Sequence, residues 1–112
     1  MRRPWGNYRA LFKAPGIQVK RLEIDPGKLF SLQRHFKREE KWIVIEGRGR
    51  VTIGNKTRSI AKGDFMVVPK RTIHRMQNTG RGPLVVIEVQ FGNYLGEDDI
   101  ERLADDFGRL QK

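Results

Sequence analysis

The sequence predicts an all-β fold, a sandwich or barrel of antiparallel strands. Along most of its 112 residues, polar and apolar side chains alternate with a period of two, which is the pattern of half-buried strands. Glycine, proline and asparagine interrupt the alternation at short intervals, as is typical of sandwiches and barrels. The length suits one domain with a single core, so residues 1–112 are expected to form one unit.

Eight strands are expected, each bounded by a turn signal. Pro26-Gly27 follows the first of them, and Gly54-Asn55 lies between "RVTI" and "KTRSI", which predicts a tight hairpin. The expected strands are residues 17–24, 29–33, 42–46, 50–53, 57–60, 65–68, 74–77 and 84–90.

Residues 97–112 break the alternation and predict a short C-terminal helix packed on the barrel. Glu97, Asp98 and Asp99 stand where the positive end of a helix dipole would favour acids. The apolar residues that follow recur with helical spacing and would form one stripe: Ile100, Leu103, Ala104, Phe107 and Leu110.

Composition limits the class of protein. The chain has no cysteine, which excludes a disulfide framework and a thiolate zinc site. No apolar run approaches the roughly 20 residues of a membrane-spanning helix, and no apolar stretch follows Arg2 and Arg3 as it would in a signal peptide. We therefore expect a cytoplasmic protein without a membrane segment.

The charge is strongly positive and unevenly distributed. The net charge is +10, with six acids against three bases in residues 97–112 and seven acids against twenty bases in residues 1–96. A positive body attracts anionic partners such as nucleic acids or phosphorylated metabolites, and it also promotes solubility. The basic stretches lack the interleaved aromatic residues on which single-stranded nucleic acids stack, so nucleic-acid binding is not favoured.

The two histidines of the chain are candidate metal ligands. His35 lies in "SLQRHFKREEKW" together with Glu40, and His74 lies in "VVPKRTIHRMQN". In a small barrel, alternate side chains of several strands converge on the interior, where imidazole nitrogen and carboxylate oxygen can share a divalent ion. Taken singly, a histidine is more often a surface or satisfied core residue than a metal ligand.

Four sequence blocks resemble the cupin domain of the type II mannose-6-phosphate isomerases. They are "RPWGNY", "SLQRHFKREEKWIVIEGRGRVTI", "GDFMVVPKRTIHRMQN" and "PLVVIEVQFGNYLGEDDIERLADDFGR", in the family's order and covering about residues 3–109. In larger relatives this domain follows a mannose-1-phosphate guanylyltransferase domain, for which 112 residues leave no room, so the cupin domain is expected to stand alone here. The resemblance implies a double-stranded β-helix (cupin jelly roll), a homodimer, and a metal-assisted interconversion of mannose 6-phosphate and fructose 6-phosphate in GDP-mannose and polysaccharide precursor metabolism.

The family's site motifs match this chain only in part. The first motif reads Gln-x-His-x-His-Arg-x-Glu-His-Trp, and here Lys37 and Lys41 stand at its second and third histidines. The matching residues are Gln33, His35, Arg38, Glu40 and Trp42 in the first motif and Pro69, His74, Arg75 and Asn78 in the second.

The resemblance therefore implies a metal site of His35, Glu40 and His74 for an ion such as zinc or manganese. A lysine ammonium has no lone pair to offer a metal, and it repels a dication. Two arrangements stay open: Lys37 turns outward and a weakened three-ligand site remains, or its ammonium takes the metal's place and pairs with Glu40.

Isomerisation through an enediolate needs a base, an electrophile and residues that bind the phosphate. The expected catalytic residues are Glu40, Arg38 and Lys37, and the expected substrate-binding residues are Arg75, Lys41 and Gln33, of which Arg75 and Lys41 would hold the phosphate. Arg3 and Trp5 are expected to fix the N-terminal segment against the barrel. The alternative is a non-catalytic cupin that binds a sugar or sugar phosphate through a degenerate metal site, which Lys37 and Lys41 favour.

Overall fold

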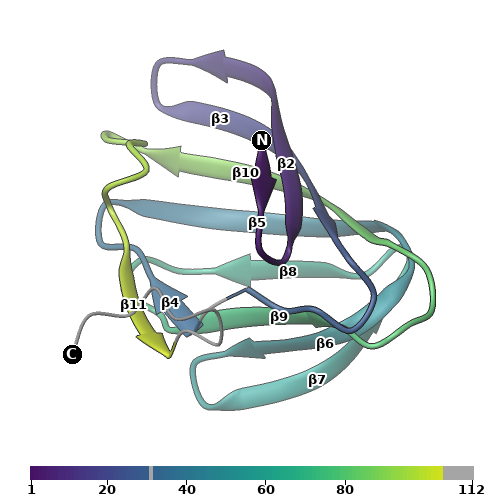
Figure 1. The fold of residues 1–112 in the computed structure, drawn as a ribbon. Coiled ribbons are helices and arrows are strands. Elements are labelled where there is room, and N and C mark those ends of the chain that lie inside the picture. The colour runs from purple at the N-terminus through teal and green to yellow at the C-terminus, as the bar shows by residue number, and fades with distance from the viewer. Residues whose placement is uncertain (31, 105–112) are drawn as a thin grey trace.

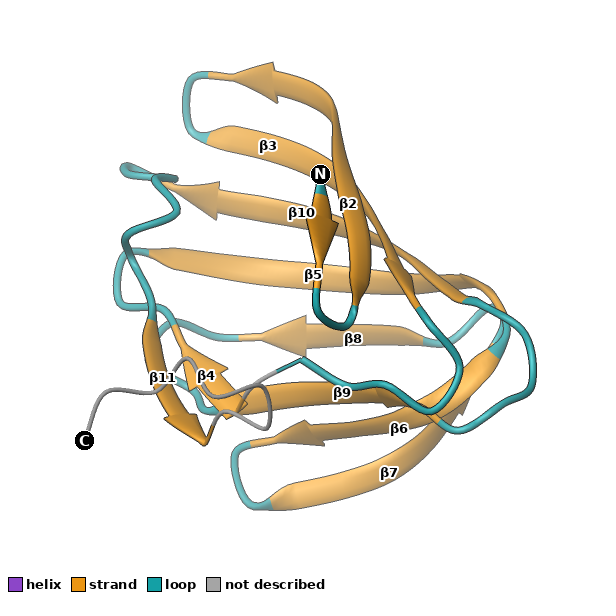
Figure 2. Ribbon diagram, in the orientation of Figure 1, coloured by secondary structure: helices purple, strands orange, loops and turns teal. Residues whose placement is uncertain are grey.

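The computed structural model describes residues 1–30 and 32–104, and these residues form eleven strands and no helix (Figure 2). This part of the chain accordingly offers no helix long and apolar enough to cross a membrane. The strands are β1 (Arg2–Arg3), β2 (Gly6–Ala14), β3 (Ile17–Ile24), β4 (Leu32–Arg34), β5 (Arg38–Glu46), β6 (Arg48–Ile53), β7 (Lys56–Ala61), β8 (Phe65–Val68), β9 (His74–Asn78), β10 (Leu84–Gly92) and β11 (Glu101–Ala104).

The strands form two antiparallel sheets that face each other (Figure 1). The larger sheet has the order β1-β2-β3-β10-β5-β8, and the smaller has the order β11-β4-β9-β6-β7. From β3 onward the chain passes back and forth between the sheets, with only the β6–β7 hairpin staying in one of them. This winding is the expected double-stranded β-helix.

The space between the sheets is filled by the inward-facing residues of alternating strands. On β3 every second residue is buried, as the period-two pattern predicts. Trp42 of β5 is fully buried, and its ring meets Phe30 edge-on with centroids 5.9 Å apart. Trp5 meets the other side of Phe30 in the same way, which ties the N-terminal segment to the core. Burying each such aromatic side chain contributes about 1.5–3 kcal/mol.

The predicted hairpin at Gly54-Asn55 is present. Ile53 of β6 pairs with Lys56 of β7, so the loop between the two strands contains only these two residues. Gly54 has φ of +65°, the left-handed conformation that the first loop residue of a type II′ turn requires.

All eight expected strand regions pair in the sheets, with shifted ends. The expected strand 29–33 is divided, because Leu29 makes an isolated bridge to Gln77 and β4 begins only at Leu32. The sequence pattern missed β1, β2 and β11. The middle of β2 is exposed on both faces, so its residues carry no alternation for the pattern to detect.

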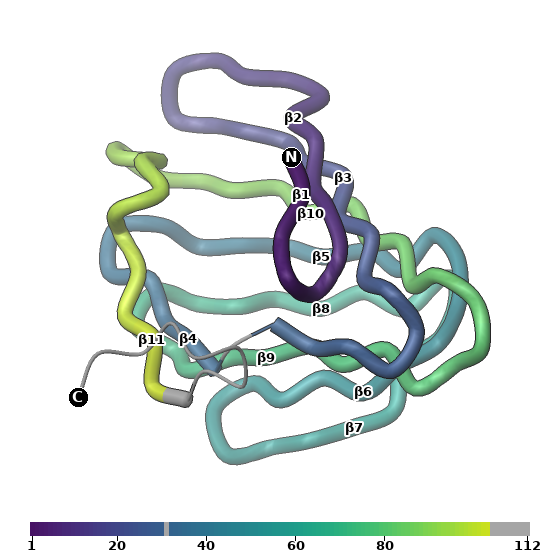
Figure 3. Tube along the Cα trace, viewed as in Figure 1, coloured from purple at the N-terminus to yellow at the C-terminus, as the bar shows by residue number. Residues whose placement is uncertain are grey.

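The predicted C-terminal helix is wrong for residues 97–104. Residues 101–104 are strand β11, which runs antiparallel to β4 (Figure 3) and places Glu101 2.5 Å from Arg34.

The acids expected at the helix start make contacts elsewhere: Glu97 with Lys20, Asp98 with Tyr94, and Asp99 with the backbone N–H groups of residues 36 and 37. The remaining expected helix residues, 105–112, lie outside the described part of the chain.

Candidate metal centre and cavity

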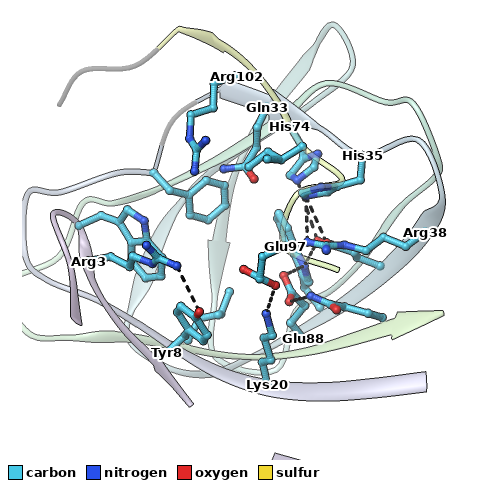
Figure 4. A pocket seen from close by; sticks show the side chains of 17 residues that line it. Arg3, Tyr8, Lys20, Gln33, His35, Arg38, His74, Glu88, Glu97 and Arg102 are labelled. Carbon is cyan, nitrogen blue, oxygen red and sulfur yellow. Dashed lines mark hydrogen bonds and ion pairs between the residues drawn. The ribbon is translucent and has the colours of Figure 1, made fainter. Parts of the chain in front are cut away.

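The inward face of the large sheet changes from apolar to polar halfway along its strands. On β10, Leu84 and Val86 are followed on the same face by Glu88 and Gln90, all of them buried. The register places Lys20 of β3 opposite Glu88. A buried polar side chain costs free energy unless it has a partner, so this end of the barrel is built for contacts with other polar groups. It lines a cavity together with residues of the small sheet (Figure 4).

Three candidate ligands converge in this cavity from different parts of the chain. His35 lies between β4 and β5, Glu40 lies on β5, and His74 begins β9. Nε2 of His35 is 3.4 Å from Oε2 of Glu40, and Nε2 of His74 is 3.9 Å from Oε1 of the same carboxylate. One ligand atom from each residue can be chosen so that all three lie within 4.8 Å of one another. The spacing suits one ion bound by all three residues.

Both imidazoles present a neutral nitrogen to the cavity. Nδ1 of His35 lies 2.5 Å from the carbonyl oxygen of Asp99, and Nδ1 of His74 lies 3.0 Å from that of Thr72. Because a carbonyl only accepts hydrogen bonds, each Nδ1 carries the proton and each Nε2 keeps its lone pair. Burial, together with the charge of Arg38, lowers the pKa of both histidines to about 4. Both imidazoles are therefore neutral at neutral pH, with Nε2 free of a proton, as metal binding requires.

The backbone around His35 is held on two sides. The Asp99 carboxylate accepts hydrogen bonds from the N–H groups of Phe36 (3.0 Å) and Lys37 (2.9 Å). On the other side, the N–H of Arg71 donates to the carbonyl of His35 at 2.6 Å. Arg71 has φ of +67°, a conformation that non-glycine residues rarely adopt and that persists here in the loop leading to His74. These contacts fix the two histidine segments against each other.

Arg38 lies within the ligand cluster. Its Nε donates to Oε2 of Glu40 at 2.7 Å, and its Nη2 lies 3.1 Å from Nε2 of His35. Burial alone would lower the pKa of this guanidinium, but the charges of Glu40 and Glu88 outweigh burial and raise it. Within the described residues, its Nη1 is buried and has no hydrogen-bond partner.

Glu88 supplies a second carboxylate next to Glu40. Nε1 of Trp42 lies 3.1 Å from Glu40 Oε1 and 3.3 Å from Glu88 Oε2, so the two carboxylates share one donor. Gln90 donates to Oε1 of Glu88 at 2.6 Å. Burial, and then the negative charge of Glu40, raise the pKa of Glu88 to about 7, while the Arg38 charge opposes the shift.

Of the substrate-binding residues expected from the sequence, the structure brings Gln33 to the cavity. Gln33 pairs with His74 across β4 and β9 and lines the same cavity. Arg75 lies on the outer side of the small sheet, where it borders a second pocket with Arg50. Adjacent residues on a strand point to opposite faces of the sheet. Because His74 points inward, its neighbour Arg75 points outward.

Neither lysine at a family histidine position lines the cavity. Lys37 is exposed, and its Nζ lies 5.0 Å from the centre of the Tyr94 ring. Lys41 follows the inward-facing Glu40, so it lies on the outer side of the large sheet with its Nζ 5.4 Å from the centre of the Phe91 ring. Lys37 was expected to act in catalysis and Lys41 to bind the phosphate. In this placement neither lysine contacts the cavity, as those roles require.

Sequence reasoning missed several residues that shape the cavity. Lys20, Glu88 and Gln90 stand at inward positions of strands that otherwise alternate correctly, and a polar residue at such a position is the signal that would have identified them. Glu97 and Asp99 were assigned to a helix end, and nothing in the local pattern links them to Lys20 and His35.

The domain matches one protein family along nearly its whole length. The family model "Mannose-6-phosphate isomerase C-terminal" matches residues 1–105. The alginate biosynthesis protein AlgA of Pseudomonas aeruginosa is 46% identical over 107 residues, which cover 96% of this chain and 22% of that protein. A mannose-1-phosphate guanylyltransferase of Sinorhizobium fredii is 42% identical over 104 residues, which cover 93% of this chain and 20% of that protein. The chain thus spans about a fifth of the length of these relatives.

Solved structures support the fold. The cupin domain of Schizosaccharomyces pombe Cnp3 superposes with a TM-score of 0.73 at 17% identity, covering 76% of this chain and 63% of that one. At this identity the likeness concerns the architecture alone. The family model and the two sequence relatives carry the assignment further: the chain belongs to the family of mannose-6-phosphate isomerase C-terminal domains.

Proposed function

We propose that this domain is a sugar-phosphate isomerase that interconverts mannose 6-phosphate and fructose 6-phosphate with the help of a divalent metal. The observation that carries the proposal is the convergence of two neutral imidazoles and a carboxylate, His35, His74 and Glu40, in a cavity with further charged groups. The family assignment supplies the reaction, and the cavity supplies groups suited to it.

The donor set fits a borderline or hard divalent ion such as zinc or manganese. Two imidazole nitrogens and one carboxylate oxygen are the ligands that such ions take in catalytic sites, where further positions stay open. One condition applies here: Arg38 must give up its contact with Nε2 of His35 before a metal can take that nitrogen. A bound metal would supply Lewis-acid polarisation of the substrate's carbonyl and hydroxyl oxygens.

We assign to Arg38 the role of binding the substrate's oxygens on C1 and C2. Its buried Nη1 lacks an acceptor among the described residues, and an unsatisfied buried donor costs about 1–3 kcal/mol. A substrate oxygen at this point would remove that cost. Because the guanidinium is fixed by Glu40, it would also stabilise the negative charge that develops in the enediolate.

Glu88 is the carboxylate that we assign to proton transfer between C1 and C2. Three glutamates line the cavity. Glu40 belongs to the ligand set and accepts hydrogen bonds from Arg38 and Trp42, and Glu97 is paired with Lys20 at 2.5 Å. Glu88 accepts hydrogen bonds from the neutral groups of Trp42 and Gln90, shares one with Glu40, and makes no ion pair within the described residues, so it is the glutamate most free to exchange a proton.

A second candidate function is a binding domain for sugar phosphates without catalysis. The contact between Arg38 and the one cavity-facing nitrogen of His35 favours it, because that contact competes with the metal. In this case Arg38 and Gln33 would recognise the sugar, and no turnover would follow.

The names of the relatives suggest the metabolic setting. One relative is named for alginate biosynthesis, and another is named a mannose-1-phosphate guanylyltransferase. We place the proposed reaction in the supply of mannose phosphates for GDP-mannose and polysaccharide precursors.

A coupled isomerase assay separates the two functions. The protein is depleted of metal with EDTA, dialysed, and assayed with mannose 6-phosphate after addition of Zn²⁺, Mn²⁺, Co²⁺ or Mg²⁺. The isomerase proposal predicts turnover that returns with at least one of these metals and is abolished by EDTA. Saturable binding of mannose 6-phosphate without turnover under any of them would support the binding domain instead.

A further inference from the structure

The cavity must provide a cation for the substrate's phosphate other than those expected from the sequence. Lys41 and Arg75 lie on the outer sides of the two sheets. The cationic residues that line the cavity are Arg3, Lys20, Arg38 and Arg102. A phosphate dianion in a partly buried site is held best by charge-assisted hydrogen bonds, above all from a guanidinium.

Arg38 Nη1 and Arg102 Nε each lack a hydrogen-bond acceptor among the described residues, but the guanidinium of Arg3 is the one held by a single hydrogen bond to a neutral group. Nζ of Lys20 is 2.5 Å from Glu97, Arg38 is 2.7 Å from Glu40, and Arg102 makes contacts of its own. Arg3 makes no direct ion pair with a carboxylate of residues 1–30 and 32–104; its charge acts at longer range on Glu97, whose pKa it helps to lower. Its Nη2 donates one hydrogen bond, of 3.2 Å, to the hydroxyl of Tyr8.

Tyr8 holds the Arg3 guanidinium in place without neutralising it. The central carbon of the guanidinium lies 5.3 Å from the centre of the Tyr8 ring, within cation–π distance. Nζ of Lys20 lies 4.6 Å from the centre of the same ring. The hydroxyl of Tyr8 accepts from Arg3, which leaves the other N–H groups of the guanidinium for a ligand. Arg3 is half-buried at the cavity, so an anion bound there would be partly shielded from water.

The position of Arg3 suits the shape of a hexose 6-phosphate. Figure 4 shows Arg3 and Tyr8 across the cavity from His35 and Arg38. The reacting carbons of such a substrate, C1 and C2, lie at one end of the open chain, and the phosphate on C6 lies at the other. With C1 and C2 beside the candidate metal ligands, the phosphate comes to the side of Arg3.

We propose that Arg3 is the principal phosphate-binding residue of this cavity. The proposal rests on the proposed function for the identity of the substrate, and it takes as its ligand class a sugar monophosphate whose phosphate is remote from the reacting carbons. Strand β1 and the turn to β2 thereby become part of the binding site, beyond their role in anchoring the chain through Trp5.

Intrinsic fluorescence can test this subsite without turnover. The chain has two tryptophans, Trp5 and Trp42, and both line the cavity. The titrants are mannose 6-phosphate, inorganic phosphate and unphosphorylated mannose. The variants are Arg3→Gln and Arg3→Lys, and the control is Arg2→Gln, the same change at the exposed neighbour that pairs with Asp25 away from the cavity.

Arg3→Gln should weaken binding of mannose 6-phosphate and inorganic phosphate about ten- to a hundredfold, the effect of a charge-assisted hydrogen bond. Binding of mannose should stay unchanged, Arg3→Lys should recover part of the loss, and Arg2→Gln should behave like the wild type. In the isomerase assay the loss should appear in KM, with kcat within about twofold.

Unchanged phosphate affinity in folded Arg3→Gln protein, checked by its thermal melting, would overturn the subsite, and so would a wild-type protein that binds neither phosphate ligand. If the wild type binds mannose 6-phosphate through Arg3 but never turns it over, the subsite stands and the isomerase proposal falls.

Discussion

Nη2 of Arg38 lies 3.1 Å from Nε2 of His35, the imidazole nitrogen that faces the cavity. The other nitrogen of His35 is held by the carbonyl of Asp99, so Nε2 is the atom that a metal would take. The same guanidinium contacts Oε2 of Glu40 at 2.7 Å. One arginine therefore contacts two of the three candidate ligands, in one case at the nitrogen that a metal would take.

Arg38→Met should tighten metal binding, because it removes a cation from beside the dication and frees two ligand atoms. We expect the dissociation constant for Zn²⁺ or Mn²⁺, measured by isothermal titration calorimetry, to fall at least about tenfold while isomerase activity is lost. The metal-free variant should also be less stable by about 3–5 kcal/mol, the usual cost of leaving one partner of a buried ion pair alone.

Arg34→Met is the matched control for that experiment. Arg34 pairs with Glu101 in the smaller sheet, outside the ligand cluster, so metal affinity should not change. Equal or weaker metal binding by Arg38→Met would show that the guanidinium supports the site and does not compete with the metal.

His74→Gln should weaken metal binding by a factor of about 100 or more, since it removes one of three protein ligands and leaves the volume of the side chain nearly unchanged. Arg75→Gln is the neighbouring control, because this residue points to the outer side of the sheet. Calorimetry of both proteins checks the prediction. Similar metal affinities for the two variants would exclude His74 from the ligand set.

The stability of the metal-free protein should rise with pH between about 4 and 6.5. Burial holds the pKa of His35 and His74 at about 4, below the ordinary 6.5, so in this window the unfolded chain binds protons that the folded chain does not. This stabilisation is present above pH 6.5 and is lost as the pH falls through 4. Glu88, with its pKa raised from 4.5 to about 7, acts in the opposite sense: its contribution is present below pH 4.5 and is lost as the pH rises through 7.

Urea denaturation in EDTA at several pH values can separate these contributions. Between pH 4.5 and 6, the slope of the unfolding free energy against pH should be smaller for His74→Gln than for the wild type. The decrease should correspond to about one proton fewer taken up on unfolding. Glu88→Gln should make the rise steeper, because it removes the opposing contribution. If plots of unfolding free energy against pH are parallel for the wild type and the two variants, then neither His74 nor Glu88 has different pKa values in the folded and unfolded states.

Glu88→Gln should lower kcat about 10²- to 10⁴-fold and change KM little, if this carboxylate moves the proton. The amide keeps the size and the acceptor oxygen of the side chain but cannot take a proton. Glu39→Gln, on the outer side of β5, is the control and should retain full activity. A Glu88→Gln enzyme with near-normal kcat would move the base role to Glu40 or to a water molecule.

Period-two alternation predicts most of the fold, and it also predicts on which face of the sheets Lys41 and Arg75 lie. Glu40 and His74 were expected inside, so their strand neighbours Lys41 and Arg75 had to face outward. The same logic identifies Glu88, a polar residue at an inward position of β10. The ligands His35, Glu40 and His74 were expected together on the strength of the family motif, and the structure brings them together.

Other features depend on contacts that no local pattern contains. The stripe from Ile100 to Leu103 suits a helix by spacing, but pairing with β4 and the contact between Arg34 and Glu101 make residues 101–104 a strand. The backbone carbonyl of Asp99 contacts the imidazole of His35, 64 residues earlier in the chain. Long-range contacts of this kind decide between local alternatives that the sequence leaves nearly equal in free energy.

The most direct test of the central claim is NMR of mannose 6-phosphate in ²H₂O with the metal-loaded protein. Isomerisation through an enediolate at this site predicts the appearance of fructose 6-phosphate together with solvent deuterium at the carbon that receives the proton. Both signals should disappear in EDTA and in His74→Gln, and both should persist in Arg75→Gln. A metal-loaded protein that binds mannose 6-phosphate yet produces neither fructose 6-phosphate nor deuterium exchange would contradict the account.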